Sequence, residues 1–242
     1  KFETDWSTYC SRKYAVAVSN GTMALVAAVR ALKLDPGDEI IIPNFTIISC
    51  ALAVLEAGCT PILIDCEPDT LNIDTELIEE AITPRTKAIM VVHIYGHPSD
   101  MQEILRIAKK YDLVVIEDAA EAHGASYNLD RSNPKSWTRC GSLTEMSTFS
   151  FFANKLITSG EGGMVLTDNF EFFSNLVAIR NLGFSKERSY LHRQEGLQLR
   201  LSSMQAALAV RQIPRMPEIL MKKKRILEYY QSGLSGLESV SL

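Results

Sequence analysis

Three groups of polar residues in this sequence have the types and spacing needed for chemistry, and each directly follows a short apolar run. The first group is Ser19-Asn20-Gly21-Thr22. Small residues that open a helix leave backbone N–H groups free to hold an anion, and the Thr22 hydroxyl adds a donor. An ordinary helix cap by Ser19 or Asn20 explains the same residues without a ligand. The sequence leaves both interpretations open, an anion site and a helix cap.

Acidic residues form the second group, which begins with Glu117 and Asp118 and continues to Glu121. The apolar run before them, residues 113–116, is expected to be buried, and an unpaired carboxylate beside it would be costly. A cationic ligand atom would pair with one of the carboxylates. Alternatively, Asp118 begins a helix as its N-cap and Glu121 closes a capping box.

The third group centres on Lys155, which lies between Phe152 and Leu156 and shortly before the glycine-rich segment 158–163. Partial removal from water makes a lysine amine a nucleophile towards aldehydes. The competing interpretation is a surface lysine whose apolar stem packs along the protein.

Apolar runs alternate with longer amphipathic segments along most of the chain, and this alternation predicts the fold that positions the three groups. Strands are expected at residues 14–18, 39–42, 61–65, 87–92, 113–117, 146–151 and 163–167. Helices are expected at residues 21–32, 47–56, 75–81, 101–110 and 170–181. The pattern predicts an α/β fold with a mostly parallel, seven-stranded sheet and helices on both faces. Residues 128–139 are expected to form a polar surface loop.

All three groups follow predicted strands, and the ligands of open α/β sheets bind at the carboxyl ends of the strands. Together the groups supply an anion cradle, a carboxylate and an amine. Pyridoxal phosphate needs this set, because its phosphate suits a helix N-terminus, its pyridinium nitrogen an aspartate and its aldehyde a lysine. The combination therefore predicts a pyridoxal phosphate site.

The composition excludes several classes of protein. With 242 residues, 46% of them hydrophobic and 22% charged, the chain suits one large globular domain rather than a disordered or coiled-coil protein. Its net charge of −4 makes nucleic acid and anionic membranes poor partners. No apolar run is long enough to span a bilayer and no signal peptide opens the chain, so we expect a cytoplasmic protein without a membrane partner.

Five cysteines are scattered through the chain without a CxxC pair, at positions 10, 50, 59, 66 and 140. This pattern indicates reduced thiols rather than disulfides, and it predicts no metal site. The basic run at residues 222–225 is expected to be a solvated helix face.

Several longer segments carry a family resemblance. They read SNGT from residue 19, PNFTIIS from 43, VHIYGHPSDM from 92, VIEDAAEAHGA from 115, STFSFFANK from 147, TSGEGGM from 158 and SMQAA from 203. In this order, across essentially the whole chain, they resemble the DegT/DnrJ/EryC1/StrS family of fold-type-I, pyridoxal-phosphate-dependent sugar aminotransferases. Within the family, these sequence segments are most similar to those of perosamine synthase-like nucleotide-sugar 4-aminotransferases. The resemblance implies a transfer of an amino group from glutamate to a nucleotide-linked 4-keto-6-deoxy sugar.

The resemblance also implies a role for each matching residue. Lys155 would form the internal aldimine, Asp118 would hold the pyridinium nitrogen, and Glu121, where many relatives have Gln, would lie near the phenolic oxygen of the cofactor. The other cofactor-binding residues would be Gly21, Thr22 and Ser150 at the phosphate and Phe45 over one face of the pyridine ring. The alternative for Phe45 is a position in the buried core.

Assembly and domain organisation follow from the same resemblance. Relatives carry Asn in a G-x-N-x-R segment that reaches the phosphate of the neighbouring subunit, and this chain has Gln198 there. A homodimer with composite active sites is implied, in which Gln198 binds the cofactor of the neighbour. Residues 1–183 would form the large cofactor-binding domain. Residues 184–242 would form an interface loop and connector helices, at 203–212 and 217–231, leading to a small C-terminal domain that relatives have and this sequence lacks.

Four histidines and two rival functions stay open. His93 and His123 either flank the cofactor or are hydrogen-bonded core residues, and His97 and His192 have no assigned role. One rival function is a dehydratase with the same cofactor. In those relatives a His replaces the lysine, so Lys155 argues against this function. The other is a non-catalytic or truncated relative that acts as a regulator or a structural partner.

Overall fold

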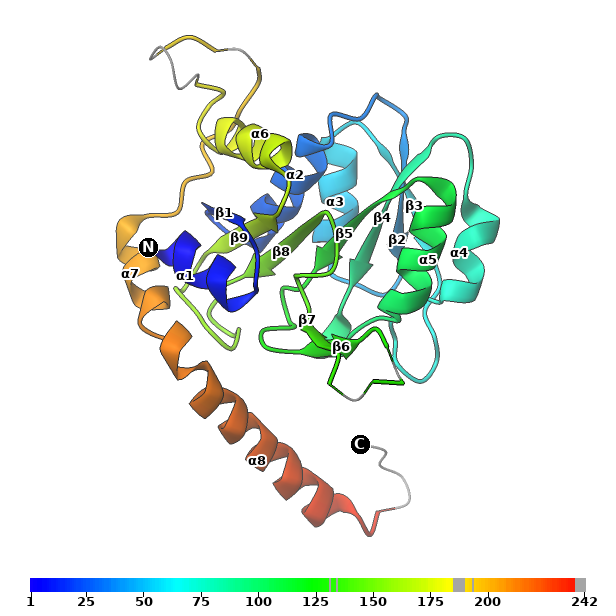
Figure 1. Ribbon diagram of the computed structural model, residues 1–242, viewed down its shortest axis with the longest axis vertical. Helices are drawn as coiled ribbons and strands as arrows, with labels where there is room; N and C mark the ends of the chain where they lie inside the picture. Colours follow the sequence, from blue (N-terminus) through cyan, green and yellow to red (C-terminus); the bar gives the residue numbers. More distant parts are fainter. Residues whose placement is uncertain (131, 134, 185–189, 193, 238–242) are drawn as a thin grey trace.

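A seven-stranded sheet forms the centre of the protein, with the strand order β1-β9-β8-β5-β4-β2-β3 (Figure 1). The computed structural model describes residues 1–130, 132–133, 135–184, 190–192 and 194–237. The strands are β1 (Tyr14–Val18), β2 (Glu39–Pro43), β3 (Thr60–Ile64), β4 (Thr86–Val92), β5 (Val114–Asp118), β8 (Met146–Ser150) and β9 (Gly163–Thr167). The predicted seven-stranded sheet is therefore confirmed.

Strand direction brings the polar groups to one end of this sheet. β2 runs parallel to β3 and β4, β4 runs parallel to β5, and β5 runs parallel to β8. β9 is antiparallel to both β8 and β1, so among the described strands of the sheet it alone runs in the opposite direction. The carboxyl ends of β1, β4, β5 and β8 consequently meet at the same end of the sheet.

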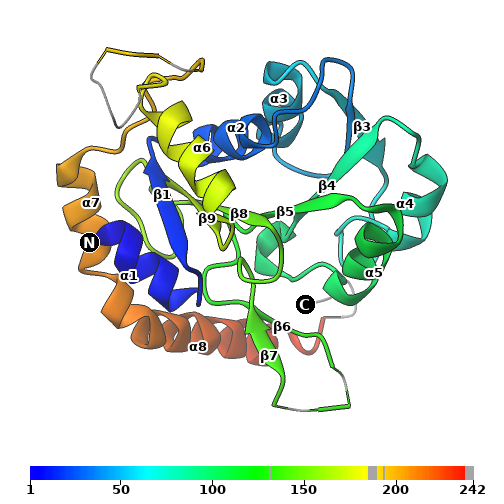
Figure 2. The ribbon, with the colours of Figure 1, turned by 45° about the horizontal axis from the view of Figure 1, so that its top comes forward.

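Helices cover both faces of the sheet (Figure 2). On one face lie α2 (Gly21–Ala31), α3 (Ser49–Glu56) and α6 (Phe170–Arg180). On the other lie α1 (Phe2–Tyr9), α4 (Thr75–Ala81), α5 (Met101–Tyr111) and α7 (Ser203–Val210). Short 3-10 segments occur at Ile94–Gly96 and Ile213–Arg215.

Neighbouring residues of the central strands pack against opposite helix layers. On β2, Ile40 and Ile42 belong to the core under α2 and α3, whereas Ile41 belongs to the core under α4 and α5. A strand buried on both faces needs a continuous apolar sequence, because successive side chains point to opposite sides. The two cores hold the strand ends in fixed positions.

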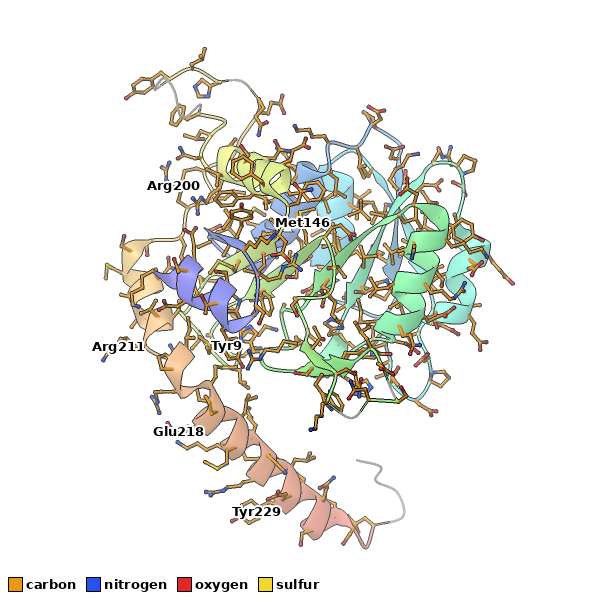
Figure 3. All side chains as sticks on the ribbon, in the orientation of Figure 1. Tyr9, Met146, Arg200, Arg211, Glu218 and Tyr229 are labelled. Carbon is orange, nitrogen blue, oxygen red and sulfur yellow. The ribbon has the colours of Figure 1, made fainter. Side chains whose placement is uncertain are left out.

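Beyond the sheet, α8 (Met216–Leu234) extends away from the body of the protein (Figure 1). Met216 is buried, but residues 221–233 are exposed on all sides of the helix, and Figure 3 shows Tyr229 far along it. Lys222 forms an ion pair of 2.6 Å with Glu218, and the whole basic run is exposed as expected. In the part of the chain that the structure describes, no helix is long and apolar enough to cross a membrane.

α1 is an element that the sequence does not predict. Its eight residues are too few to show a clear helical period. Tertiary packing holds it in place, because Trp6 is fully buried with its ring 5.1 Å from that of Phe149 and 5.2 Å from that of Phe151.

The prediction of a loop across residues 128–139 is wrong at both ends of that segment. β6 (Ser126–Asn128) and β7 (Trp137–Arg139) pair as a small antiparallel hairpin. Each strand has only three residues, which is too short for an alternating pattern to be recognised in a polar sequence. The expected interface loop falls partly outside the described residues, at 185–189 and 193.

Candidate active site

A cavity of about 870 Å³ opens at the carboxyl ends of the parallel strands. This volume lies in the range of about 300–1,000 Å³ that is usual for ligand pockets. Its walls include these residues from the sequence-based site: Gly21, Thr22, Phe45, Asp118, Glu121, Ser150 and Lys155. The fold therefore brings together side chains that are up to 134 residues apart, from Gly21 to Lys155.

The N-terminus of α2 faces the cavity. Asn20 caps the helix, since its side-chain oxygen accepts a 2.9 Å hydrogen bond from the backbone N–H of Met23. The helix hydrogen bonds begin only at the N–H of Ala24, so the N–H groups of Gly21 and Thr22 precede them and suit an anion. The two interpretations of this segment are thus compatible, with Asn20 as the cap and the next two residues in the cavity wall.

Glycine is required at position 21 because β8 ends against the start of α2. A Cβ atom on Gly21 would lie 2.8 Å from the Cβ atom of Ser150. Any larger residue would push the helix away from Ser150, whose side chain lies in the same wall. The Thr22 and Ser49 hydroxyls form a 2.8 Å hydrogen bond beside this contact and join the starts of α2 and α3.

Asp118 is the last residue of β5, and its side chain is almost completely buried. Its Oδ1 atom accepts a 3.0 Å bond from the N–H of Ala120, and its Oδ2 atom lies 3.5 Å from the Sγ atom of Cys50. Burial raises the pKa of Asp118 above its ordinary value, although these two bonds and the nearby side chains of His93 and Lys155 act to lower it. The carboxylate is short of donors for a group so deeply buried.

The capping-box interpretation of Asp118 and Glu121 is wrong. The chain turns after β5 instead of entering a helix, and the Glu121 carboxylate reaches across the cavity wall. Its Oε1 atom lies 3.0 Å from the Nζ atom of Lys155, and its Oε2 atom accepts a 2.8 Å bond from the N–H of Tyr95. Glu121 therefore fixes both the lysine and the mouth of the cavity.

Lys155 is not a surface lysine. Its side chain is 17% exposed and lies in the cavity wall together with Phe152. Phe45 is not a core phenylalanine either, since it is 41% exposed and faces the cavity with its ring 6.3 Å from that of Tyr95. The rings of Phe45 and Tyr95 therefore lie at the entrance of the cavity, and the amine of Lys155 lies inside it.

Comparison with known proteins decides the family. The family model described as "DegT/DnrJ/EryC1/StrS aminotransferase family" matches residues 1–242. The chain belongs to this family. It is 42% identical over 237 residues to the GDP-perosamine synthase of Caulobacter vibrioides, covering 98% of this chain and 62% of that protein. It is 37% identical over 242 residues to the dTDP-3-amino-3,4,6-trideoxy-alpha-D-glucose transaminase of Streptomyces venezuelae, covering 100% of this chain and 61% of that protein.

A solved structure that is similar in sequence has the same fold. The Bacillus subtilis protein NtdA with bound cofactor PMP matches with a TM-score of 0.84 and 34% identity, covering 98% of this chain and 52% of that chain. PMP is the amino form of pyridoxal phosphate. The chain spans less than two thirds of the length of each of these relatives.

The residues of this family member fit pyridoxal phosphate. The start of α2 gives a cradle for the phosphate in which a Cβ atom at Gly21 would clash. The buried Oδ2 atom of Asp118 has a thiol as its donor and retains capacity for a proton on a ring nitrogen. Lys155 supplies a largely buried amine for the aldehyde in the same cavity. Pyridoxal phosphate is therefore the cofactor of this aminotransferase-family chain.

Two buried histidines lie behind the cavity wall rather than in it. The Nδ1 atom of His93 accepts a 3.2 Å bond from the N–H of Ser99, so its Nε2 atom carries the proton and donates to Glu117 at 3.1 Å. The Nδ1 atom of His123 accepts a 3.5 Å bond from the N–H of Ile157. Burial and the nearby charge of Lys155 lower the pKa of His123 to about 3, so this histidine is neutral. Both are hydrogen-bonded core residues.

The other predicted residues lie elsewhere. Gln198 is exposed and is absent from the described lining of the cavity, and its Oε1 atom accepts a 2.8 Å bond from the N–H of Arg200. His97 and His192 are also outside the described lining. The Nδ1 atom of His192 donates to the carbonyl of Leu182 at 2.7 Å. None of these three contacts the cavity of its own chain within the described residues.

Sequence reasoning missed several residues of the site, and four of them bear on its chemistry. Tyr95, Thr46 and Ser49 line the cavity, and Cys50 lies behind it against Asp118. The polar residues after β2 carry the signal that could have identified three of them, because that strand also ends at the ligand-binding end of the sheet. Tyr95 has the left-handed φ of 54°, which a sequence cannot reveal for a tyrosine.

Proposed function

We propose that this chain carries the catalytic centre of an aminotransferase that moves an amino group from glutamate to C4 of a nucleotide-linked 4-keto-6-deoxy sugar. The observation that carries the proposal is the joint presence of Lys155, Asp118 and the start of α2 around one cavity. The similarity to GDP-perosamine synthase supports the 4-amino product. The similarity to a 3-amino-sugar transaminase makes the 3-keto isomer the competing substrate.

When bound, pyridoxal phosphate supplies an aldehyde that links to amines and a ring that withdraws electrons from them. The chain's own residues bind the cofactor, orient it and move protons. Lys155 binds the aldehyde and, once released, moves a proton on its Nζ atom to the carbon that receives the amino group. Asp118 holds the proton on the ring nitrogen, and Glu121 orients the lysine through the 3.0 Å contact. The N–H groups of Gly21 and Thr22 and the Ser150 hydroxyl bind the phosphate.

A coupled assay tests the proposal. Purified protein with pyridoxal phosphate is given glutamate and either a nucleotide-linked 4-keto-6-deoxyhexose or its 3-keto isomer, and 2-oxoglutarate is measured. We expect more than one equivalent of 2-oxoglutarate per active site only with the 4-keto sugar, because glutamate alone converts the bound cofactor once and then stops. Faster turnover of the 3-keto isomer would contradict the position of transfer. Cofactor binding without turnover of either sugar would favour the non-catalytic relative.

We also propose a homodimer with composite active sites, in which residues 1–183 form the large cofactor-binding domain and residues 184–242 form an interface loop and connector helices. Apolar side chains on and before α3 lie exposed beside the cavity mouth, with exposures of 60% for Ile47, 65% for Ile48, 48% for Leu52 and 56% for Leu55. A second copy would cover this face and bring its own Gln198 to the phosphate.

Complementation tests this assembly directly. Lys155→Ala and Gln198→Ala chains are each expected to be weakly active alone, because every site in either homodimer is damaged. Mixed after unfolding and refolding together, they form one intact site for each heterodimer, and we expect activity to return. Light scattering that gives a monomer, or a mixture no more active than its parts, would contradict composite sites.

A further inference from the structure

Cys50 is the second residue of α3 and is completely buried behind the cavity wall. Its Sγ atom lies 3.5 Å from the Oδ2 atom of Asp118 and 3.4 Å from the Oγ1 atom of Thr46. Burial and the charge of Asp118 hold the pKa of Cys50 well above its ordinary value, so the group is a thiol at neutral pH. The S–H group therefore donates to Asp118, and the sulfur accepts from the Thr46 hydroxyl.

The donor that the protein provides to Oδ2 is consequently weak. A thiol is a poorer hydrogen-bond donor than a hydroxyl or an amide. A strong donor would stabilise the ionised carboxylate and reduce its affinity for a proton. With the thiol, more of the negative charge on Oδ2 remains available to a protonated ring nitrogen.

We infer that Cys50 is a positioning residue that sets the basicity of Asp118, and through it the protonation of the ring nitrogen of bound pyridoxal phosphate. The inference rests on the proposed function, because it concerns how Asp118 serves that cofactor. The contact with Cys50 holds the Oδ2 atom of Asp118 in place, and because the thiol is a weak donor it leaves the carboxylate more basic than a stronger donor would.

The other groups that face Asp118 are the same in every Cys50 variant. They are the N–H of Ala120, the charge of Lys155, and His93, which directly follows the neighbouring strand β4. A substitution at Cys50 therefore changes one hydrogen-bond donor to Asp118 and leaves the other groups around Asp118 unchanged.

Two substitutions at Cys50 have opposite expected effects on Asp118. Cys50→Ser places a stronger donor at nearly the same position, and we expect the proton affinity of Asp118 to fall by about threefold to tenfold. Cys50→Ala removes the donor, and we expect the proton affinity to rise. The measurement is a pH titration of the Asp118 carboxyl by carbon-13 NMR in the cofactor-free protein, with Asp118→Asn used to assign the signal.

A second readout uses pyridoxal phosphate labelled with nitrogen-15 in the ring. In Cys50→Ser protein we expect the signal to move towards the value of neutral pyridine, and in Cys50→Ala protein to stay at the pyridinium value. Cys59→Ser is the matched control, because Cys59 is also a buried thiol but its Sγ atom contacts the carbonyl of Ala57. It is expected to change neither signal.

Opposite shifts of the Asp118 titration in the two variants support the inference, since a packing role has no reason to change sign. Equal shifts of this titration, or no shift of it in a variant that thermal unfolding shows to be folded, would overturn it. If one variant does not fold, the direction of the shift in the other decides: the direction given above, with no shift in Cys59→Ser, supports the inference, and the reverse direction or no shift overturns it. Wild-type protein that binds no pyridoxal phosphate would instead overturn the proposed function and this inference with it, whereas the cofactor-free titration separates the two failures.

Discussion

Glu117 and Asp118 are neighbours on β5, both are completely or almost completely buried, and they have opposite surroundings. The Glu117 carboxylate accepts bonds from the N–H of Gly141 at 2.6 Å, the N–H of Leu143 at 3.0 Å, the Thr144 hydroxyl at 3.0 Å and His93 at 3.1 Å. Burial acts to raise the pKa of Glu117, but the bonds from His93 and the two N–H groups outweigh it and hold the pKa below its ordinary value.

Asp118 has one N–H group and one thiol, and burial raises its pKa. Successive residues of a strand face opposite sides, so one carboxylate faces the core under α4 and α5 and the other faces the cavity. A buried carboxylate with a full set of hydrogen-bond donors, such as Glu117, stabilises the fold. A buried carboxylate with few hydrogen-bond donors, such as Asp118, remains able to bind a ligand.

The largest expected effect concerns the amine beside this pair. Lys155→Ala removes both the group that links to the cofactor and the proton carrier, and we expect transamination to fall by about 10⁴-fold or more. The coupled glutamate assay measures the loss. Lys222→Ala, at an exposed lysine on α8, is the control and should retain full activity. Substantial activity in Lys155→Ala would contradict the central role of the cavity.

Asp118→Asn is expected to have the next largest effect on rate. Asn cannot keep the ring nitrogen protonated, so we expect the half-reaction with glutamate to slow by about 10²-fold or more, with normal folding. Stopped-flow absorbance follows the half-reaction, and circular dichroism follows the fold. A near-normal rate would mean that another residue holds the ring nitrogen.

Glu117→Gln should affect stability instead. The change leaves donors that converge on a charged carboxylate facing a neutral amide, and we expect a loss of about 2–4 kcal/mol in the free energy of unfolding. Because the pKa of Glu117 lies below its ordinary value of 4.5, its contribution is present above that pH and is lost as the pH falls below it. Urea unfolding at pH 7 and at pH 3 should therefore show a smaller difference between wild type and variant at pH 3.

The smallest expected effect is a stabilisation, and its sign distinguishes Asp118 from Glu117. A raised pKa means that charged Asp118 destabilises the cofactor-free protein at pH 7, and this penalty disappears as the pH falls through the raised value towards 3.8. Asp118→Asn should therefore stabilise the cofactor-free protein by about 1 kcal/mol at pH 7. Thermal unfolding without cofactor measures it. Destabilisation by both Glu117→Gln and Asp118→Asn would remove the distinction between the two residues.

The sheet could be predicted from sequence because its strands are continuous apolar runs. The cavity residues could be predicted because they lie at the ends of those strands or just after them, as Asp118 ends β5 and Gly21 follows β1. The short elements could not, since α1 depends on the packing of Trp6 and the hairpin of β6 and β7 has no periodic pattern. Short elements are stabilised by contacts distant in sequence.

The difference between Glu117 and Asp118 could not be predicted either. Both are acids at the end of one apolar run, and only the fold shows that Gly141, Leu143 and Thr144 converge on the first of them. The sequence-based helix cap at Asp118 failed for the same reason, because local spacing cannot tell a cap from a strand end. Cys50 has no motif at all, and its contact with Asp118 spans 68 residues.

Reduction of the loaded protein with borohydride tests the central claim most directly. Pyridoxal phosphate bound through an amine absorbs visible light, loses this absorbance on reduction and remains attached to the lysine that holds it. We predict that peptide mass spectrometry finds the adduct on Lys155, and that Lys155→Ala protein carries none. An adduct on a different lysine, or no stable adduct in the wild-type protein, would contradict the assignment of this cavity as the cofactor site.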